Sequence, residues 1–114
     1  MKIENQTRET VLMSTGRRAD TFWLRLKGLL GSPPLKQGEG LLLVNEKSIH
    51  TLFMGFAIDV VYIDQANKVI KLTHAMPPWR LGPFVSQSAG IIELPPGVID
   101  ATNTTVGDQL ILSA

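Results

Sequence analysis

The sequence predicts a mainly β protein: a compact, closed or nearly closed β-barrel or sandwich of about six to eight short strands. Two observations predict this fold class. Apolar residues come in short runs separated by Gly and Pro, as in strands joined by turns. Only residues 18–30 repeat their apolar positions at the spacing of a helix. A chain of 114 residues has room for one hydrophobic core, so we expect a single domain over residues 1–114.

One N-terminal helix is expected, over about residues 18–30. Asp20 or Thr21 can cap its N-terminus, and Gly28 or Gly31 can supply the left-handed residue that ends it. An apolar stripe at helical spacing would pack against a sheet. The stripe consists of Phe22, Leu26, Leu29 and Leu30.

Six segments have the composition of strands. They are residues 7–14, 41–45, 58–64, 68–74, 90–94 and 109–113. The continuous apolar run at 41–45 predicts a strand buried on both faces. Alternation within 68–74 would place Val69, Lys71 and Thr73 on one face and Ile70 and Leu72 on the other. Residues 75–88 are expected to form a long ordered loop, and 97–103 fit a short helical turn. The core expected from the longest apolar runs contains Leu42, Val44, Val60, Ile70 and Ile92.

Composition narrows the classes of function. The chain has no cysteine, which excludes disulfides, thiolate metal sites and cysteine nucleophiles. Its formal net charge is +1 without a concentrated basic run, so nucleic-acid binding is not expected. No apolar run reaches the roughly 18 residues of a membrane span, and residues 1–10 lack the apolar segment of a secretory signal. We therefore expect a soluble, cytoplasmic protein, and the sequence indicates no particular oligomeric state.

A series of motifs runs in order over most of the chain. They are RLKGLLG at 25–31, LKQGEGLLL at 35–43, SIHTLFMGFAIDVVYID at 48–64, MPPWR at 76–80, IIELPPG at 91–97 and VGDQL at 106–110. This ordered set resembles the small bacterial and archaeal family catalogued as domain of unknown function one-hundred-ninety-two. The resemblance implies a compact, mostly β fold with a helix near the N-terminus, and no established biochemical activity. Many members carry a basic residue and an Asn where this chain reads GFA at 55–57, and many are exported.

Polar residues within the otherwise apolar motif SIHTLFMGFAIDVVYID mark the first candidate site. A buried carboxylate needs a partner, so Asp59 is expected to form an ion pair or turn cap with Arg25 or Arg80. The alternative role for this carboxylate is that of a general base or ligand acceptor. His50 is either a satisfied structural residue or an imidazole oriented by Asp59. We expect His50, Asp59 and Arg80 to close one hydrogen-bonded cluster that holds two loops together at a pocket.

Further residues have chemistry that a site could use. Trp79 and Arg80 follow a Pro-Pro pair and could bind a sugar ring, a carboxylate or a partner's side chain, or simply anchor their loop. Two imidazoles and two thioethers would suit monovalent copper, although methionines more often fill cores. These four residues are His50, Met54, His74 and Met76. Glu93, between Ile92 and Leu94, is expected to point away from both, into solvent or at a barrel rim.

The leading hypothesis is a binding or accessory module with a polar site between residues 48–59 and 76–80. Its partner would be a small polar ligand or a protein segment, and neither a metal nor a cofactor is expected. The expected ligand-binding residues are His50, Thr51, Met54, Asp59, Trp79 and Arg80. The alternatives are a small hydrolase-type enzyme with His50 and Asp59 as its acid–base pair, and a copper-handling module. Whether the protein is an enzyme stays open at this point.

Overall fold

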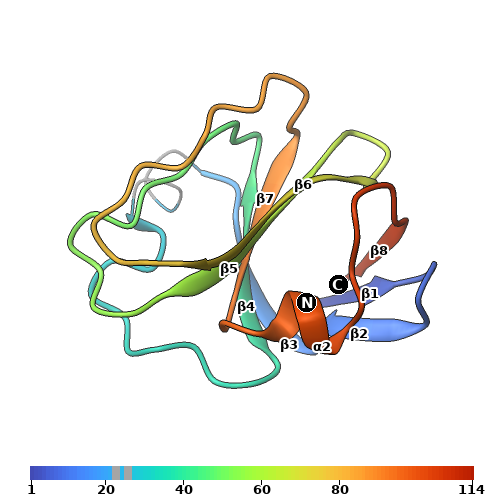
Figure 1. Cartoon of the computed structure of the whole chain (residues 1–114), viewed down its shortest axis with the longest axis horizontal. Helices are drawn as coiled ribbons and strands as arrows, with labels where there is room; N and C mark the ends of the chain where they lie inside the picture. Colours follow the sequence, from blue (N-terminus) through green and yellow to red (C-terminus); the bar gives the residue numbers. More distant parts are fainter. Residues whose placement is uncertain (22–23, 25–26) are drawn as a thin grey trace.

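A computed structural model of the chain describes residues 1–21, 24 and 27–114. Within these residues the chain forms eight strands and the short helix α2 (Figure 1). The strands are β1 (Lys2–Asn5), β2 (Thr10–Met13), β3 (Thr15–Ala19), β4 (Glu39–Val44), β5 (Ile58–Ile63), β6 (Val69–Met76), β7 (Gly90–Leu94) and β8 (Leu110–Ser113), and α2 spans Val98–Ala101. No helix in this part of the chain is long and apolar enough to cross a membrane.

The strands form two sheets. A three-stranded sheet has the order β2-β1-β8, and a five-stranded sheet has the order β3-β4-β7-β5-β6. Paired strands are antiparallel except β3 and β4, which run parallel. Among the described residues, the isolated bridge between Lys68 and Gln109 links the edges of the two sheets just before β6 and β8, and no pairing of whole strands joins them into a single closed sheet. The predicted mainly β class is therefore confirmed in its sandwich form.

The inner core fills the space between the two sheets. Residues of the three-stranded sheet contact residues of the five-stranded sheet, and Ile99 of α2 joins them. Its buried members are Ile3, Leu12, Met13, Leu42, Val61, Ile63, Val69, Ile92, Leu94, Ile99 and Leu110. Burial of apolar area at about 25 cal/mol per Å² makes this contact the main force that holds the sheets together.

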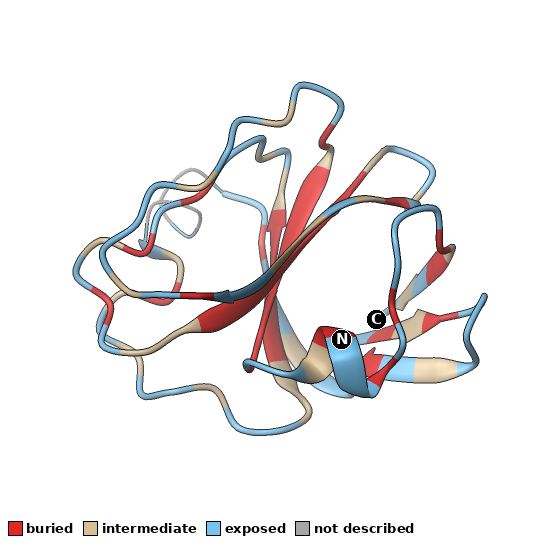
Figure 2. Ribbon diagram, in the orientation of Figure 1, coloured by how far each residue is buried: buried red, intermediate tan, exposed pale blue. Residues whose placement is uncertain are grey.

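The outer core lies on the other face of the five-stranded sheet, where loops cover the strands. Its buried members are Ala19, Leu29, Leu41, Leu43, Ile49, Met54, Ile58, Val60, Tyr62, Met76 and Ile91. Figure 2 shows the central strands buried, while the loops beside them expose much of their outer surface. The strand predicted at 41–45 is therefore buried on both faces, as expected.

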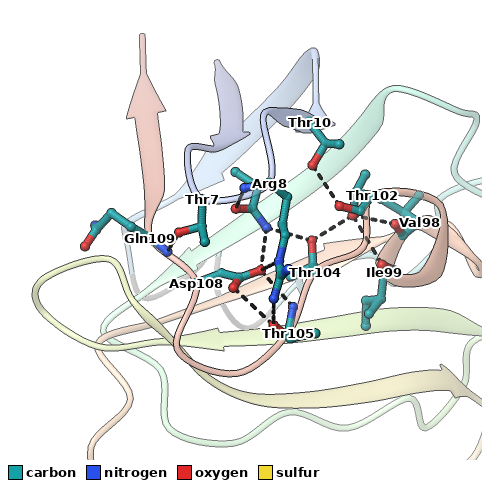
Figure 3. A network of polar contacts seen from close by, with 11 residues as sticks. Thr7, Arg8, Thr10, Val98, Ile99, Thr102, Thr104, Thr105, Asp108 and Gln109 are labelled. Atoms are coloured by element: carbon teal, nitrogen blue, oxygen red, sulfur yellow. Dashed lines mark hydrogen bonds and ion pairs between the residues drawn. The ribbon is translucent and has the colours of Figure 1, made fainter.

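A polar network ties the last turn of the chain to the first hairpin (Figure 3). The buried Asp108 carboxylate accepts hydrogen bonds of 2.9 Å from Asn5 Nδ2 and from the Thr105 backbone N–H. Arg8 Nε lies 3.1 Å from the same oxygen and adds a positive charge. Burial alone would raise the pKa of Asp108, but these donors outweigh burial and lower the pKa to about 2.

The N-terminal region differs from the prediction. The sequence does not predict β1, which is a strand because β2 and β8 pair with it on its two sides. The strand predicted at 7–14 is shorter than expected, since residues 7–9 form a turn before β2. Residues 15–19 form β3, so a helix beginning at residue 18 is wrong. Parallel pairing with β4 satisfies the backbone groups of β3 in place of helical hydrogen bonds.

Part of the predicted helix is confirmed at its C-terminal end. Leu24 and Lys27 are helical, and the Leu24 N–H donates a hydrogen bond of 3.2 Å to Thr21 Oγ1, one of the two predicted caps. The Gly28 N–H donates to the Leu24 carbonyl at 2.9 Å, and the positive φ of Gly28, 49°, ends the turn. Leu29 is buried and Leu30 half-buried against the outer core. Phe22, Trp23, Arg25 and Leu26 lie outside the described residues.

The other predicted strands and the helical turn are confirmed, and the predicted loop is confirmed from residue 77, because β6 extends to Met76. The faces of β6 are not as predicted. Val69 and Leu72 contact the inner core, whereas Ile70 contacts the outer core. The pairing of β5 with β6 shifts register between Tyr62 and Ile63, which inserts Ile70 as an extra residue and reverses the alternation. Of the predicted core, Leu42, Val60 and Ile92 are buried, and Val44 and Ile70 are half-buried.

Candidate functional site

Thr51 joins the two loops that flank the expected site. Its buried Oγ1 donates a hydrogen bond of 2.6 Å to the Pro77 carbonyl and accepts one of 2.9 Å from the Arg80 N–H. The Thr51 backbone forms two more bonds of 2.8 Å, with the Arg80 carbonyl and the Trp79 N–H. The two loops therefore contact each other directly, and a threonine hydroxyl fills the space between them.

Asp59 is only 1% exposed, and three backbone N–H groups satisfy its carboxylate. Oδ1 accepts a hydrogen bond of 2.8 Å from Ala75. Oδ2 accepts bonds of 3.0 Å from Gly97 and 2.9 Å from Ile99. Asp59 therefore caps α2 and the end of β6 rather than facing a ligand site. Arg25, one of its two predicted ionic partners, lies outside the described residues.

The structure does not form the predicted cluster of His50, Asp59 and Arg80. Among the described residues, no hydrogen bond or ion pair joins Arg80 to either of the other two. Arg80 is exposed, and its Nη1 donates a 3.4 Å bond to the Trp79 carbonyl. His50 is also exposed, and its Nδ1 accepts a 3.2 Å bond from the Leu52 N–H. The loops need no buried cation, because backbone bonds and Thr51 already join them.

A cavity of about 210 Å³ lies between residues 27–30, residues 46–54 and the five-stranded sheet. Most of its wall is apolar, formed by Leu29, Leu30, Leu43, Ile49 and Met54. Its polar lining residues are Lys27, Glu46, Ser48, His50 and Glu93. His50 and Met54 are thus the two predicted ligand-binding residues that line the cavity. The other four, Thr51, Asp59, Trp79 and Arg80, do not line it.

Glu93 projects from the middle of the sheet to this cavity. In β7 it pairs with Leu41 of β4 and with Val60 of β5, so a strand flanks it on each side. Its exposed fraction is 4%. Among the residues that the structure describes, none forms a hydrogen bond or ion pair with its carboxyl group. An isolated charged carboxylate is costly to bury, so burial disfavours the charged form of this group unless it gains a partner.

Burial raises the pKa of Glu93 from 4.5 to about 7, because the charged form loses water and gains no donor. The neighbouring Tyr62 phenol does not donate a hydrogen bond to the Glu93 carboxylate, since its Oη donates to the Pro83 carbonyl at 3.1 Å. The pKa of Tyr62 is itself raised, first by burial and then by the charge of Glu93. At neutral pH the Glu93 carboxyl is therefore divided between its neutral and charged forms.

The four residues of the copper hypothesis do not all line one cavity. Met54 and Met76 are both buried in the outer core, where they act as apolar side chains. Met54 and His50 line the Glu93 cavity, and the other two residues do not. His74 Nε2 instead lies 3.3 Å from Asp100 Oδ1.

Trp79 and Phe53 form an aromatic contact on the outside of the joined loops. Their ring centroids are 4.7 Å apart with the planes tilted by 59°. Trp79 is 56% exposed and Phe53 73% exposed. Both have a positive φ, 63° and 65°, which bulky residues rarely adopt. Trp79 therefore has an intramolecular contact while more than half of its surface stays open to solvent.

Comparison with known proteins assigns the chain to a family. The model of DUF192, described as "Uncharacterized ACR", matches residues 3–112. The chain belongs to the DUF192 family. A UPF0127 protein of Thermococcus sibiricus is 36% identical over 110 residues, which cover 93% of this chain and 71% of that protein. A UPF0127 protein of Pyrococcus furiosus is 35% identical over 97 residues, covering 82% and 83% of the two chains.

Two solved structures are similar to this DUF192 chain. One is a crystal structure of a protein of unknown function from Novosphingobium aromaticivorans, with a TM-score of 0.83 and 14% identity. The match covers 97% of this chain and 82% of that one. The other, from Sinorhizobium meliloti, has a TM-score of 0.80 and 15% identity, and covers 96% and 89% of the two chains. At these identities the likeness shows the fold, which is the compact, mostly β fold that the family resemblance implies.

In this DUF192 chain, Glu93 lines the candidate site but is not among the ligand-binding residues expected from the sequence, which placed it in solvent or at a barrel rim. The alternation of side chains along β7 is predicted correctly, since the Glu93 side chain points away from Ile92 and Leu94. The error concerns what covers the opposite face, which is a layer of loops rather than solvent. A signal was present in Ile91, an apolar residue two positions earlier on the same face of the strand.

Proposed function

We propose that this protein is a binding module that holds a small molecule in the cavity beside Glu93. One observation carries the proposal: a carboxyl group that is 4% exposed lines the cavity without a partner among the described residues. Buried polar groups in native proteins nearly always have hydrogen-bond partners. A buried titratable group without one, at the wall of an apolar cavity, is typical of a site that a ligand completes.

The size and lining of the cavity suit a compact molecule with an apolar body. Its wall consists mostly of Leu, Ile and Met side chains, which favour hydrocarbon groups. The volume of about 210 Å³ is below the roughly 300–1,000 Å³ of sites for drug-sized ligands. The expected ligand is therefore smaller than a typical drug molecule and carries one polar head group for Glu93.

A second candidate function is proton transfer on the bound molecule. The hydrolase hypothesis with His50 and Asp59 has little support, because backbone N–H groups occupy the Asp59 carboxylate. Glu93 is better suited to this chemistry, since a pKa of about 7 allows it to donate or accept a proton near neutral pH. His50 lines the same cavity and offers a second titratable group. Both functions require that a molecule bind there first.

A fragment screen by two-dimensional NMR tests the binding function. Fragments that occupy the cavity should shift the backbone amide signals of Leu43, Ile49 and Met54. Leu30→Phe should reduce these shifts, because the larger side chain fills part of the cavity that Leu30 lines. Leu52→Phe is the matched control, since Leu52 belongs to the same segment, residues 46–54, but does not line the cavity. A screen without shifts at the lining residues would contradict the proposal.

A further inference from the structure

We propose that the ligand of this cavity is a small primary amine, bound as its ammonium ion against the Glu93 carboxylate with its apolar body against the surrounding side chains. This inference rests on the proposed binding function and assigns a chemical class to the ligand. Three features of the described residues support it. They are an acceptor without a donor, the absence of a buried cation from the cavity lining, and an apolar wall.

The Glu93 carboxylate has acceptor oxygens, and among the described residues no donor forms a hydrogen bond with it. The Tyr62 hydroxyl donates to the Pro83 carbonyl at 3.1 Å. The Thr51 hydroxyl donates to the Pro77 carbonyl at 2.6 Å. An ionised carboxylate can only accept, so the ligand has to supply the donors. An ammonium group supplies three N–H donors together with the opposite charge, which strengthens each hydrogen bond.

The charged groups around the cavity favour a cation over an anion. Among the described residues of the lining, Glu46 and Glu93 are acidic and Lys27 is basic, and Glu46 already takes part in an interaction of its own. Lys27 is exposed, so water and salt weaken its field, whereas Glu93 is buried in a medium of lower dielectric. The remaining titratable groups are His50, which is exposed, and the Tyr62 phenol, which is neutral near pH 7. An anionic ligand would lie beside the like charge of Glu93.

Binding of an ammonium ion changes the protonation of Glu93. A simple alkylamine, like the Lys side chain with its pKa of about 10.4, is already a cation at pH 7. The ligand therefore keeps its protons, and a neutral Glu93 releases its own proton to the buffer as the ion pair forms. With a pKa of about 7 in the free protein, about half a proton per bound ligand should be released at pH 7. Almost none should be released at about pH 9.

Isothermal titration calorimetry on the full chain tests the assignment with three probes that share one ring. The probes are cyclohexylamine, cyclohexanol and cyclohexanecarboxylate. We expect the amine to bind at least tenfold more tightly than the alcohol, and the carboxylate not to bind. Amine titrations in buffers of different ionisation enthalpy should report release of about half a proton at pH 7. Amide shifts at Ile49 and Met54 locate each probe in the cavity.

Glu93→Gln supplies the matched variant, because it removes the charge and keeps the shape of the side chain. We expect the affinity for cyclohexylamine to fall at least tenfold, to the level of cyclohexanol, and proton release to disappear. Glu4→Gln makes the same chemical change in β1 of the other sheet, and both quantities should stay as in the unaltered protein. The comparison of the three probes uses the unaltered protein, so it remains decisive if Glu93→Gln folds poorly.

The possible outcomes separate this inference from the proposed function. Equal or tighter binding of the alcohol or the carboxylate in the cavity would overturn the amine assignment and leave the binding function standing. Unchanged amine affinity in a folded Glu93→Gln protein would also overturn the assignment. An absence of amide shifts at the lining residues with every probe and every fragment would overturn both proposals.

Discussion

The Asp59 carboxylate accepts a hydrogen bond of 2.9 Å from the backbone N–H of Ile99, which lies 40 positions further along the chain. The same side chain accepts bonds from Gly97 and Ala75. One buried residue of β5 therefore holds the start of α2 and the irregular end of β6 in place. Each of these backbone donors would be left without a partner if the carboxylate were removed.

We expect Asp59→Asn to lower the free energy of unfolding by about 2–3 kcal/mol. An Asn side chain has one acceptor oxygen for three donors, and its NH₂ group would face a backbone N–H. Urea denaturation followed by circular dichroism measures the loss. Arg80→Ala is the control, and it should change stability by less than about 0.5 kcal/mol because Arg80 is exposed. The double variant Asp59→Asn/Arg80→Ala should lose the sum of the two single losses. A departure from that sum by more than about 1 kcal/mol would show that the two side chains interact, against the structure.

Thr51→Val should loosen the contact between the two loops and cost about 1–3 kcal/mol. Valine keeps the shape but leaves the Pro77 carbonyl and the Arg80 N–H without their partner. Thr51→Ser retains the hydroxyl and should lose less. Hydrogen exchange at the Arg80 amide provides a local measurement, with faster exchange expected in the Val variant than in the Ser variant. Equal exchange in the two variants would argue against the hydroxyl contact.

The pKa of Glu93 predicts a specific dependence of stability on pH. Below about pH 4.5 the carboxyl is protonated in the folded and unfolded states, so it has no effect. As the pH rises toward 7, the unfolded state releases its proton while the folded state retains it, and the free energy of unfolding falls. We expect Glu93→Gln to gain roughly 2–3 kcal/mol relative to the unaltered protein between pH 5 and pH 8. Urea denaturation of both proteins at these pH values measures the difference. If the free energy of unfolding changes with pH in the same way in both proteins, the raised pKa of Glu93 is contradicted.

Asp108 should produce the opposite dependence at acid pH. Its pKa is lowered to about 2 in the folded state, so the stability that it contributes is complete above 3.8 and is lost as the pH falls toward 2. Asp108→Asn should remove this acid sensitivity and cost about 1.5–3 kcal/mol at pH 7, since buried Asn5 loses a charged acceptor. Acid titration followed by circular dichroism compares the two proteins. If the pH at the midpoint of acid unfolding is the same in Asp108→Asn as in the unaltered protein, the hydrogen bonds of Asp108 contribute little to stability.

Leu42→Ala should lower the free energy of unfolding by about 2–5 kcal/mol. Leu42 is buried in the inner core on β4, so the substitution removes apolar contact and leaves a cavity. Thermal unfolding at pH 7 measures the change. Ile111→Ala is a suitable control, because Ile111 on β8 is exposed and should lose much less.

The central strands could be predicted because their local sequence contains the cause of their structure. β4, β5 and β7 are mostly apolar on both faces, and the structure covers both faces. β1 and β3 could not be predicted in this way. β3 contains Gly16 and two arginines, and it is a strand because its backbone pairs with β4. Such pairing depends on residues far along the chain, which local propensity does not contain.

For the candidate site, the need for partners could be predicted but the partners could not. The sequence shows that Asp59 needs hydrogen bonds when buried, and the structure supplies them from backbone groups of Ala75, Gly97 and Ile99. The positions of those groups depend on the register shift in β6 and on the start of α2. The direction of Glu93 could be read from alternation. The segments that cover it, residues 27–30 and 46–54, lie far from it in the sequence, so local alternation does not reveal them.

The pairing of β1 with β8 has a consequence for the order of events during synthesis. β1 is made before the other seven strands described here, yet one of its two neighbours is β8, the last of them. The hydrogen bond from Asn5 to the Asp108 carboxylate likewise joins residues that are 103 positions apart in the sequence. The β1–β2 hairpin alone is too small to be stable in water. The three-stranded sheet and the inner core that it covers can therefore form only after β8 has been made, and this high contact order makes folding slow compared with proteins of mainly local contacts.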